Sequence, residues 1–436
     1  RKAIRLSKVV VGDNFTNSAA GKHFYAQRGT LNTSASNYSI NTTTLGDLNG
    51  TNSKTITLNS SVITCTNLVF SGSGALTITS SAHTININSD TATAANFLGN
   101  SGWGTINFNL APTAARAYAI TFGTGAAFVA FNIDMTTDRR DSTVSFSGDF
   151  SVSSSSSWLG GSDPTYSPLI KSSEIGTART LTVTAASKTI TLTDVDVQDI
   201  VIATTNSPTV TGTRVGNAGG NTNAGVSAPK TVYAALDTAA YCIVINVLVK
   251  TQETSKATRN AASKSLNNFP LPQDTLVIDD YSWTSGTSLF DISTTGVRVG
   301  RVDLSGLSEN HQIWFNNLTH YGSIISTGST YTVNQYNGTI FDARLAGTLL
   351  LDFTQGGSNF TFTVNSYGGT VKLNSNISSS ATQTLTRGTF DLNGKILTTG
   401  IFAQNDAAAF AKLKEAKIDA ALQAMANGLR TRFNEK

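Results

Sequence analysis

The chain has 436 residues and a net charge of +4; Thr (64), Ser (48), Asn (37) and Gly (37) dominate it, and 13% of its residues are charged. A typical soluble domain carries about 25% charged residues. Because the sequence has no cluster of five or more basic residues, it does not predict nucleic-acid binding. The longest apolar run, Tyr241–Val249, is about half the length of a membrane-spanning helix, so no membrane insertion is expected.

The residue types favour strands over helices. Thr and Val fit a pleated surface, whereas Asn and Gly suit tight turns. Glu, which favours helices, occurs five times in the whole chain. Hydrophobic residues make up 39% of the sequence, and disordered chains are poor in them. The composition therefore predicts a folded all-β protein.

The first 215 residues divide into two parts. Residues 1–50 are polar and show no regular apolar pattern, so we interpret them as an irregular N-terminal attachment segment. From 51 to 215, apolar and polar side chains alternate, as in Lys54–Leu58 and His83–Asn88. Alternation with a period of two is typical of strands that bury one face. Residues 51–215 are therefore predicted to form a first β-rich unit.

One six-residue sequence occurs twice, as Ser53–Leu58 and Ser187–Leu192, and Gly369–Asn374 is a looser third copy. Repeated strand-like runs with no helical pattern between them predict a structural repeat that needs its neighbours to bury its apolar edge. We favour a solenoid of stacked strands, a β-helix. Tandem β-sandwich units require the same alternation and are the alternative.

The second half contains three further segments. Residues 216–229 are rich in Gly and Asn and are predicted to be a linker, and residues 230–405 are predicted to be a second β-rich unit. Residues 406–436 change to Ala, Lys, Leu and Glu and predict a single C-terminal α-helix with one apolar stripe. Such a helix either caps the open end of the strand stack or docks on a partner subunit. The stripe consists of Phe410, Leu413, Ile418, Leu422, Met425, Leu429 and Phe433.

The cysteines and histidines show no arrangement typical of a reactive or metal site. Cys65 and Cys242 are predicted to be buried thiols that act as small hydrophobic residues. His311 and His320 flank an aromatic run, and we expect both imidazoles to be exposed and without a paired role. No metal-binding or cofactor motif occurs, so no cofactor is predicted.

Glycoside hydrolysis needs two carboxyl groups on either side of the scissile bond. Asp279 and Asp280 are adjacent and would point to opposite faces of a strand, so a turn at a strand end is favoured over a catalytic pair. Asp194 and Asp196, near Asp199, are predicted to share one outward, solvated face. The sequence leaves catalysis open but favours a protein that is not an enzyme, and no catalytic residue is assigned.

Exposed aromatic rings are the usual platforms for sugar faces, with Asn, Thr and Ser supplying hydrogen bonds. We therefore take Trp283, Trp314 and Tyr281 as candidate ligand-binding residues. Trp103 and Trp158 are weaker candidates. A place in the core is the competing interpretation for every one of these tryptophans.

The segment Asn267–Asp279 has a polar loop followed by the pattern N-x-P-x-x-x-D-T-aliphatic-x-aliphatic-D. Thr231–Tyr233 precedes it, and Val299–Ser305 and Leu385–Lys395 follow it. Together these segments resemble repetitive β-rich tail-fibre and related virion structural proteins of phages. The resemblance spans about 230–402, and it carries no catalytic residue over to this chain.

The resemblance implies a structural protein on the surface of a phage particle. The expected role is a tail fibre or tail-associated adsorption protein that binds a host surface polysaccharide. The expected partners are further copies of the chain, as a trimer, and other virion proteins bound through the two termini. A capsid-decoration or head-fibre protein, a tailspike polysaccharide hydrolase and a bacterial surface adhesin or filament subunit are the alternatives. An adhesin would require an export signal upstream of Arg1.

Overall fold

A computed structural model gives the structure of this chain. It describes residues 8–10, 15–16, 23–25, 29–33, 39–46, 53–70, 75–79, 82–89, 94–97, 101–111, 115–136, 142–161, 167–234, 248–249, 269–282, 289–292, 296–308, 312–326, 332–355 and 360–404. The chain divides into two compact units, Arg1–Ser227 (unit 1) and Ala228–Lys436 (unit 2).

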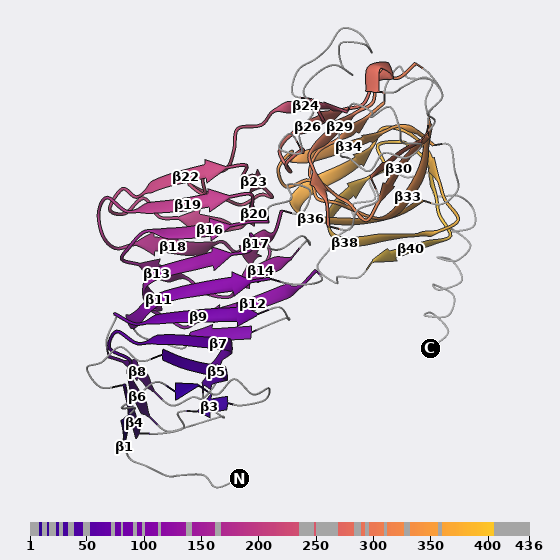
Figure 1. Cartoon of the computed structure of the whole chain (residues 1–436). Helices are drawn as coiled ribbons and strands as arrows, with labels where there is room; N and C mark the ends of the chain where they lie inside the picture. The colour runs from indigo at the N-terminus through magenta and orange to yellow at the C-terminus, as the bar shows by residue number, and fades with distance from the viewer. Residues whose placement is uncertain are drawn as a thin grey trace, which may run out of the picture. The chain divides into compact units, whose positions relative to one another are not determined.

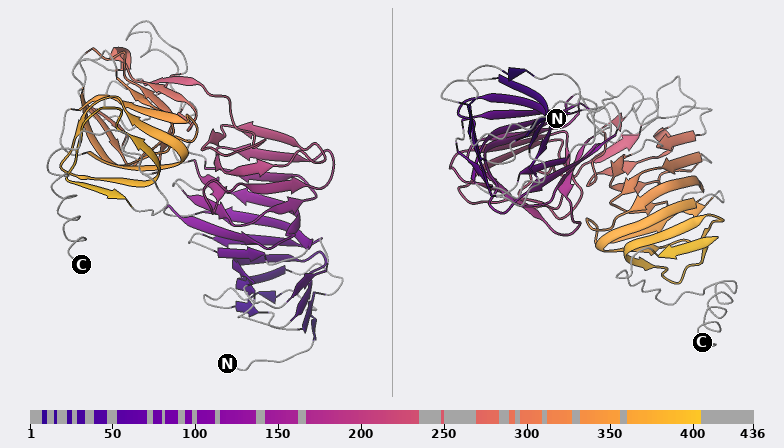
Figure 2. Two further views of the ribbon diagram at one scale, coloured as in Figure 1. Left: turned by 180° about the vertical axis from the view of Figure 1, so that it is seen from behind. Right: turned by 90° about the horizontal axis from the view of Figure 1, so that it is seen from below.

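Both units are β-solenoids, and together they make about 11 turns. Among the described residues every strand pairing is parallel except that of β24 (Thr231–Ala234) with β25 (Leu248–Val249). A β-sandwich consists of antiparallel sheets, so the parallel pairing confirms the β-helix interpretation and excludes tandem sandwiches. Figures 1 and 2 show the strands of each unit stacked one above the other.

In unit 1 the strands form parallel stacks. The first stack, in chain order, consists of β5 (Ser39–Gly46), β7 (Val62–Val69), β9 (Thr84–Ser89), β11 (Ser101–Leu110), β13 (Ala127–Asp134), β16 (Ser156–Leu159), β19 (Thr189–Thr193) and β22 (Thr209–Thr213). β2 (Phe15–Thr16) and β3 (His23–Tyr25) pair with β5. The second stack consists of β10 (Ala94–Phe97), β12 (Ala117–Phe122), β14 (Thr143–Phe146), β17 (Leu169–Ser172), β20 (Asp196–Gln198) and β23 (Gly216–Asn217). The remaining strands are β1 (Lys8–Val10), β4 (Gly29–Asn32), β6 (Lys54–Thr57) and β8 (Leu76–Ile78) in one sheet, and β15 (Phe150–Val152), β18 (Arg179–Val183) and β21 (Ile200–Ile202) in another stack.

Unit 2 is built in the same way. One path runs through β24, β26 (Thr275–Val277), β29 (Arg301–Asp303), β32 (Ile324–Ile325) and β34 (Thr348–Asp352). The other runs through β27 (Leu289–Ile292), β30 (Gln312–Asn316), β33 (Thr332–Phe341), β36 (Phe360–Leu373), β38 (Thr382–Asp391) and β40 (Ile401–Gln404). Shorter elements are β28 (Arg298–Val299), β31 (Thr319–His320), β35 (Thr354–Gln355), β37 (Ile377–Ser378), β39 (Leu397–Thr398) and the 3-10 helix η2 (Asp280–Ser282).

Each unit has its own hydrophobic core, filled by every second side chain of its strands. The repeated sequence shows how this works, because its apolar positions are inward in all three copies. Each of these residues is at most 1% exposed: Ile56 and Leu58, Ile190 and Leu192, and Val371 and Leu373. Threonines fill the alternate outward positions in the first two copies. The expected burial of one apolar edge per repeat is therefore confirmed.

Left-handed residues turn the chain at the corners of unit 1. Asp194 has φ of 51° and Arg214, one turn later, has φ of 53°. Asp199 has φ of 55°, and Gly219 and Gly220 occupy the same corner one turn on, with φ of 96° and 72°. Asp and Gly are among the residues that tolerate this conformation best. The same backbone corner therefore recurs with a spacing of about 20 residues.

Two predicted segments differ from what the structure describes. Residues 1–50 were expected to be irregular, but their described residues form the five strands β1 to β5. Most of 216–229, the predicted linker, lies in the last turn of unit 1, where Ala218 and Ala224 are buried and Thr222 bridges to Val201. A Cβ at Gly220 would lie 1.9 Å from Oδ1 of Asp199, so a larger residue would not fit this position of the turn. The helix predicted for 406–436 lies outside the described residues.

The described part of the chain contains no helix with the length and apolarity that crossing a bilayer requires.

Candidate functional site

The predicted aromatic ligand-binding residues have different surroundings. Tyr281 lies in η2 and is 39% exposed. Trp314 lies on β30 between Ile313 and Phe315, which are both fully buried, so its half-buried ring is at an outward position of the strand. Trp283 lies outside the described residues. Tyr281 and Trp314 are thus the described aromatic candidates with a surface that a ligand can contact.

Trp103 and Trp158, the weaker candidates, belong to the core, which confirms the competing interpretation for these two residues. Their exposed fractions are 1% and 0%. Trp103 packs edge-on against Phe97, with ring centroids 5.1 Å apart, and Trp158 donates from Nε1 to the carbonyl of Phe131 at 3.2 Å. Both occupy inward positions of strands in the first stack, where a large ring fills the interior of the solenoid.

Asp279 and Asp280 form a turn after β26, as the sequence predicted. Asp279 is 9% exposed, and its Oδ1 accepts hydrogen bonds from the backbone N–H of Tyr281 (3.0 Å) and the hydroxyl of Ser282 (3.2 Å). Asp280 accepts from the backbone N–H of Ser308 at 2.8 Å and also from its hydroxyl. These carboxylates fix the local backbone, which is the usual role of Asp in turns.

The prediction that Asp194 and Asp196 share an outward, solvated face was wrong. Asp194 lies between β19 and β20 at a left-handed corner, and Asp196 is 3% exposed. A left-handed residue interrupts the alternation of a strand, so residues on its two sides no longer follow one pattern. Asp199 is also 3% exposed, and it accepts a hydrogen bond from the backbone N–H of Gly176 at 3.0 Å.

The expectation that His320 is exposed was also wrong. His320 is fully buried, and its ring lies 5.5 Å from that of Phe315 and 5.4 Å from that of Phe341. Burial lowers the pKa of His320 to about 3, because the charged form loses its hydration. His311 lies outside the described residues. Among the described residues no three His, Cys, Asp or Glu side chains are grouped so as to hold a metal ion.

The predicted burial of Cys65 is confirmed. Its thiol is 2% exposed, and burial raises its pKa to about 12. A thiol of this pKa is almost entirely protonated at neutral pH, and the thiolate is the reactive form. Cys65 is therefore a packing residue, and Cys242 lies outside the described residues.

The outward face of the first stack in unit 1 has a row of hydrogen-bonded polar side chains, which we call the polar ladder. Asn107 donates from Nδ2 to Oδ1 of Asn86 at 2.8 Å, and Asn132 donates in the same way to Asn107 at 2.9 Å. Ser157 continues the row with a backbone N–H that donates to Oδ1 of Asn132 at 2.9 Å. The polar ladder consists of Asn86, Asn107, Asn132, Ser157, Thr191 and Thr211.

Parallel in-register pairing creates this row. Ser157 pairs with Thr191, and Thr191 pairs with Thr211, whose hydroxyl donates to that of Thr191 at 3.3 Å. Neighbouring strands lie about 4.8 Å apart, so each side chain of the ladder stands directly beside the next. A second row of the same face contains Asn88 and Asn109, joined by a hydrogen bond of 2.8 Å.

The ladder face is polar but almost uncharged. In the first stack, the outward positions of the described strands from β7 to β22 hold Thr, Asn and Ser, with Gly and a few apolar residues, and Asp134 is the charged residue among them. Asp134 accepts hydrogen bonds from the backbone N–H of Thr136 at 3.0 Å and its hydroxyl at 2.6 Å. A face of this kind offers hydrogen bonds to neutral ligands and little attraction to ions.

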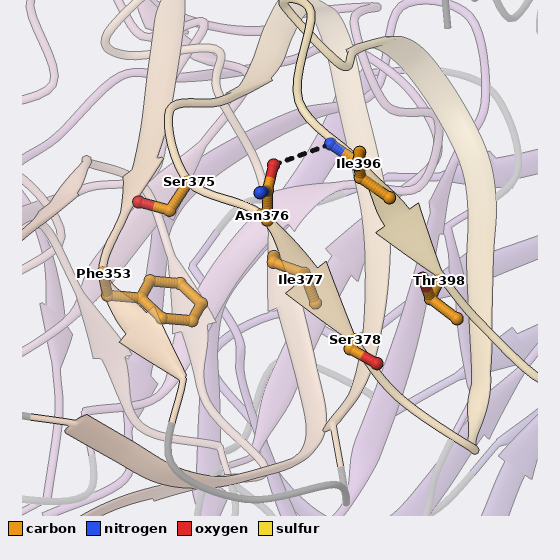
Figure 3. A pocket seen from close by; sticks show the side chains of 7 residues that line it. All are labelled: Phe353, Ser375, Asn376, Ile377, Ser378, Ile396 and Thr398. Carbon is orange, nitrogen blue, oxygen red and sulfur yellow. Dashed lines mark hydrogen bonds between the residues drawn. The ribbon is translucent and has the colours of Figure 1, made fainter. Parts of the chain in front are cut away.

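A shallow pocket lies on unit 2 and has a volume of about 460 Å³. Its lining is uncharged and comes from β37, β39 and the residues beside them: Phe353, Ser375, Asn376, Ile377, Ser378, Ile396 and Thr398. Figure 3 shows these side chains and the hydrogen bond of 2.9 Å from the backbone N–H of Ile396 to Oδ1 of Asn376. Phe353 and Ile377 are almost completely buried, whereas Ile396 is 44% exposed. No acid lines the pocket, so it lacks the carboxyl pair of a glycosidase.

No protein-family model, no curated protein and no solved structure matches the chain.

Proposed function

We propose that this chain is a structural adsorption protein of a phage particle, a tail fibre or tail-associated protein that binds a neutral host surface polysaccharide. The polar ladder carries this proposal. The ladder presents a side-chain amide or hydroxyl group at each of its turns, and a polysaccharide presents hydroxyl groups at every repeat. The placement on a phage particle rests on the sequence resemblance of segment 230–402, together with a fold that is compatible with a fibre.

The ladder has hydrogen-bonding capacity left for a ligand. A side-chain amide has two N–H donors and an oxygen with two lone pairs. Asn107 uses one N–H toward Asn86 and accepts one bond from Asn132, which leaves one donor and one lone pair. Hydroxyl groups of sugars both donate and accept, so they can use both. Because the ladder bonds already hold the amides in place, binding costs little side-chain entropy.

Unit 2 contributes two aromatic candidates to the proposed role. The half-buried ring of Trp314 and the 39% exposed ring of Tyr281 are platforms on which a sugar face can stack. Trp283 lies two residues after Tyr281 in the sequence and is the third candidate. We propose that the protein is a trimer, because a homo-oligomer protects strand edges. Light scattering of the dilute protein measures its mass directly, and a monomeric mass would refute the trimer.

The first experiment combines a pull-down on host envelope polysaccharide with an assay for new reducing ends. Binding without new reducing ends supports the proposed adsorption role. New reducing ends would instead make the chain a tailspike hydrolase, and a lack of both would favour a capsid-decoration or scaffold role. Asp279, Asp280, Asp194 and Asp196 are the residues to change if cleavage is observed.

Matched threonine variants test whether the ladder is the binding surface. Thr191 lies in the ladder on β19, and Thr182 lies on β18 of the same turn in a different stack; both side chains are half-buried. Loss of one hydrogen bond costs about 0.5–1.5 kcal/mol, so Thr191→Ala and Asn107→Ala should each weaken binding about three- to tenfold. Thr182→Ala should leave binding unchanged. Equal binding of all three variants would remove the ladder from the site.

A further inference from the structure

Four asparagines on the ladder face form a regular array on two neighbouring strands of unit 1. Asn86 and Asn88 lie on β9, and their partners in the parallel pairing are Asn107 and Asn109 on β11. Neighbouring strands lie about 4.8 Å apart, and residues two apart on one strand lie about 6.6 Å apart. All four side chains are exposed or half-buried. We call these four residues the amide quartet.

The hydrogen bonds within each row run in the same direction. Asn107 donates from Nδ2 to Oδ1 of Asn86, and Asn109 donates in the same way to Asn88, each at 2.8 Å. On the next strand, Asn132 donates to Oδ1 of Asn107 at 2.9 Å. The nitrogen of the Asn107 amide therefore faces one neighbouring strand and its oxygen faces the other, so the plane of the amide contains the direction of the row.

The planar shape of the amide determines where its remaining groups point. A side-chain amide has two N–H donors and two lone pairs on its oxygen. In Asn107 the row uses the N–H and the lone pair that point along it. The other N–H and the other lone pair lie side by side on the edge of the amide farthest from Cβ, and this edge points away from the sheet. Asn107 thus presents one donor and one acceptor that point outward together.

The other members of the quartet keep the same edge free. In the described part of the chain, Asn86 and Asn88 each use one lone pair of the oxygen, and Asn109 uses one N–H. Asn132 differs, because its Oδ1 accepts from the backbone N–H of Ser157 at 2.9 Å and from the Ser157 hydroxyl at 3.5 Å. Both lone pairs of Asn132 are then occupied. The complete pair of donor and acceptor is therefore a property of the quartet.

The chemistry of this edge selects the ligand. A vicinal diol has two hydroxyl groups on adjacent carbons, so one hydroxyl can donate to the amide oxygen while the other accepts from the amide nitrogen. A carboxylate has acceptors only and would turn a lone pair toward the amide oxygen. Asp134, the partner of Asn109 on β13, also places a negative charge beside the quartet. Both features favour a neutral diol over an anion.

We propose that the amide quartet recognises vicinal diols, and that the ligand is a neutral polysaccharide with a free diol on its sugar rings. This inference rests on the proposed function and specifies the class of glycan that the ladder face binds. Each amide of the quartet holds one diol through two hydrogen bonds. The quartet offers four such contacts on two adjacent strands.

Chemical removal of the diols tests the proposal with the natural chain. Periodate cleaves the bond between adjacent carbons that both carry hydroxyl groups, and borohydride then reduces the aldehydes that form. In a pull-down, the protein should bind host envelope polysaccharide at least tenfold more tightly than the same material after this treatment. Equal binding of treated and untreated material would overturn this inference and leave the proposed function intact. A lack of binding to the untreated material would refute the proposed function itself, and this inference with it.

A pair of glucose hexamers controls for the loss of ring structure that periodate causes. Each ring of cellohexaose has a free vicinal diol, whereas the inner rings of laminarihexaose have none, because the linkage occupies one of the two oxygens. Cellohexaose should release the protein from the polysaccharide at a concentration at least tenfold lower than laminarihexaose. Release at equal concentrations, or a failure of cellohexaose to release the protein, would overturn the proposal.

Variants connect the preference for diols to the quartet. Asn96 lies at a half-buried, outward position of β10 in the second stack, so it is a matched control for Asn107. The double variant Asn107→Ser with Asn109→Ser should bind treated and untreated polysaccharide within about twofold of each other, because a Ser hydroxyl has a single oxygen. Asn96→Ser should keep the full preference for untreated material. Thermal unfolding checks that both proteins are folded, and an unchanged preference in the double variant would overturn the proposal.

Discussion

Arg214 donates a hydrogen bond from Nε to Oδ1 of Asp194 at 2.7 Å, and the two residues occupy the same corner of successive turns. Their side chains are 13% and 25% exposed, so the ion pair is partly shielded from water. Both residues have left-handed backbone conformations, with φ of 53° and 51°. The pair therefore combines two features that stabilise a corner of unit 1: a left-handed backbone conformation in both residues and a side-chain hydrogen bond between successive turns.

Two substitutions of Asp194 separate these contributions. A charged hydrogen bond contributes about 1.5–3 kcal/mol, and a left-handed residue with a Cβ costs about 1–2 kcal/mol. Asp194→Gly loses the ion pair but has no backbone strain, whereas Asp194→Ala loses the pair and is strained. We expect Asp194→Ala to lower the free energy of unfolding by about 1 kcal/mol more than Asp194→Gly, as measured by urea denaturation. Equal losses would mean that the corner conformation carries no energetic cost.

Substitution of Trp158 and substitution of Trp314 should have different effects on stability and on binding. Trp158 is fully buried, and removal of a buried Trp side chain costs about 3–5 kcal/mol. Trp314 is half-buried at an outward position, so Trp314→Ala should cost less than half of this. Trp314→Ala should instead weaken polysaccharide binding. Thermal unfolding and the pull-down measure both effects, and a larger stability loss for Trp314→Ala would contradict the described burial.

Unit 2 should lose stability in mild acid because of His320. The folded-state pKa of His320 is lowered to about 3, whereas the unfolded value is about 6.5. Between these values the unfolded chain binds a proton that the folded chain does not, so stability is complete above pH 6.5 and falls as the pH is lowered. The expected loss is about 2 kcal/mol between pH 6.5 and pH 5.

His320→Gln, which does not titrate, is the control for this pH dependence. Urea denaturation of the variant should show a much smaller change between pH 6.5 and pH 5 than the parent chain. The same slope in both proteins would assign the pH dependence to other groups.

The thiol of Cys65 should resist alkylation in the native protein. Its pKa of about 12 leaves very little thiolate at pH 8, and the side chain is 2% exposed. Iodoacetamide at pH 8 should label Cys65 at least a hundredfold more slowly in the native protein than in urea. Peptide mapping by mass spectrometry identifies the site, and rapid native labelling would show that this part of the core opens readily.

The polar ladder could be predicted from the sequence only in part. Alternation places Asn86, Asn107 and Asn132 on the outward face of their strands, and this much follows from the sequence. The steps between them are 21 and 25 residues, so no fixed spacing connects them. Only the parallel register brings the three amides side by side. The loops between successive turns differ in length, so residues at the same position of neighbouring strands are not separated by a constant number of residues.

The predictions for Asp194, Asp196 and His320 were wrong for a related reason. For Asp194 and Asp196, one left-handed residue ended the alternation on which the prediction rested. His320 is part of the two-residue strand β31, which is too short for a period of two to be recognised. In both cases a short local irregularity decided which side of the backbone faced the core.

Composition and alternation were enough to predict that this protein is β-rich and repetitive. They also predicted which residues of its regular strands are inward, because burial follows directly from the alternation of side chains along a strand. The tertiary structure decided the parallel solenoid over the sandwich, the corners at which alternation is reset, and the rows in which distant side chains meet. These depend on which strands become neighbours, and strand pairing is a property of the folded chain that alternation leaves undetermined.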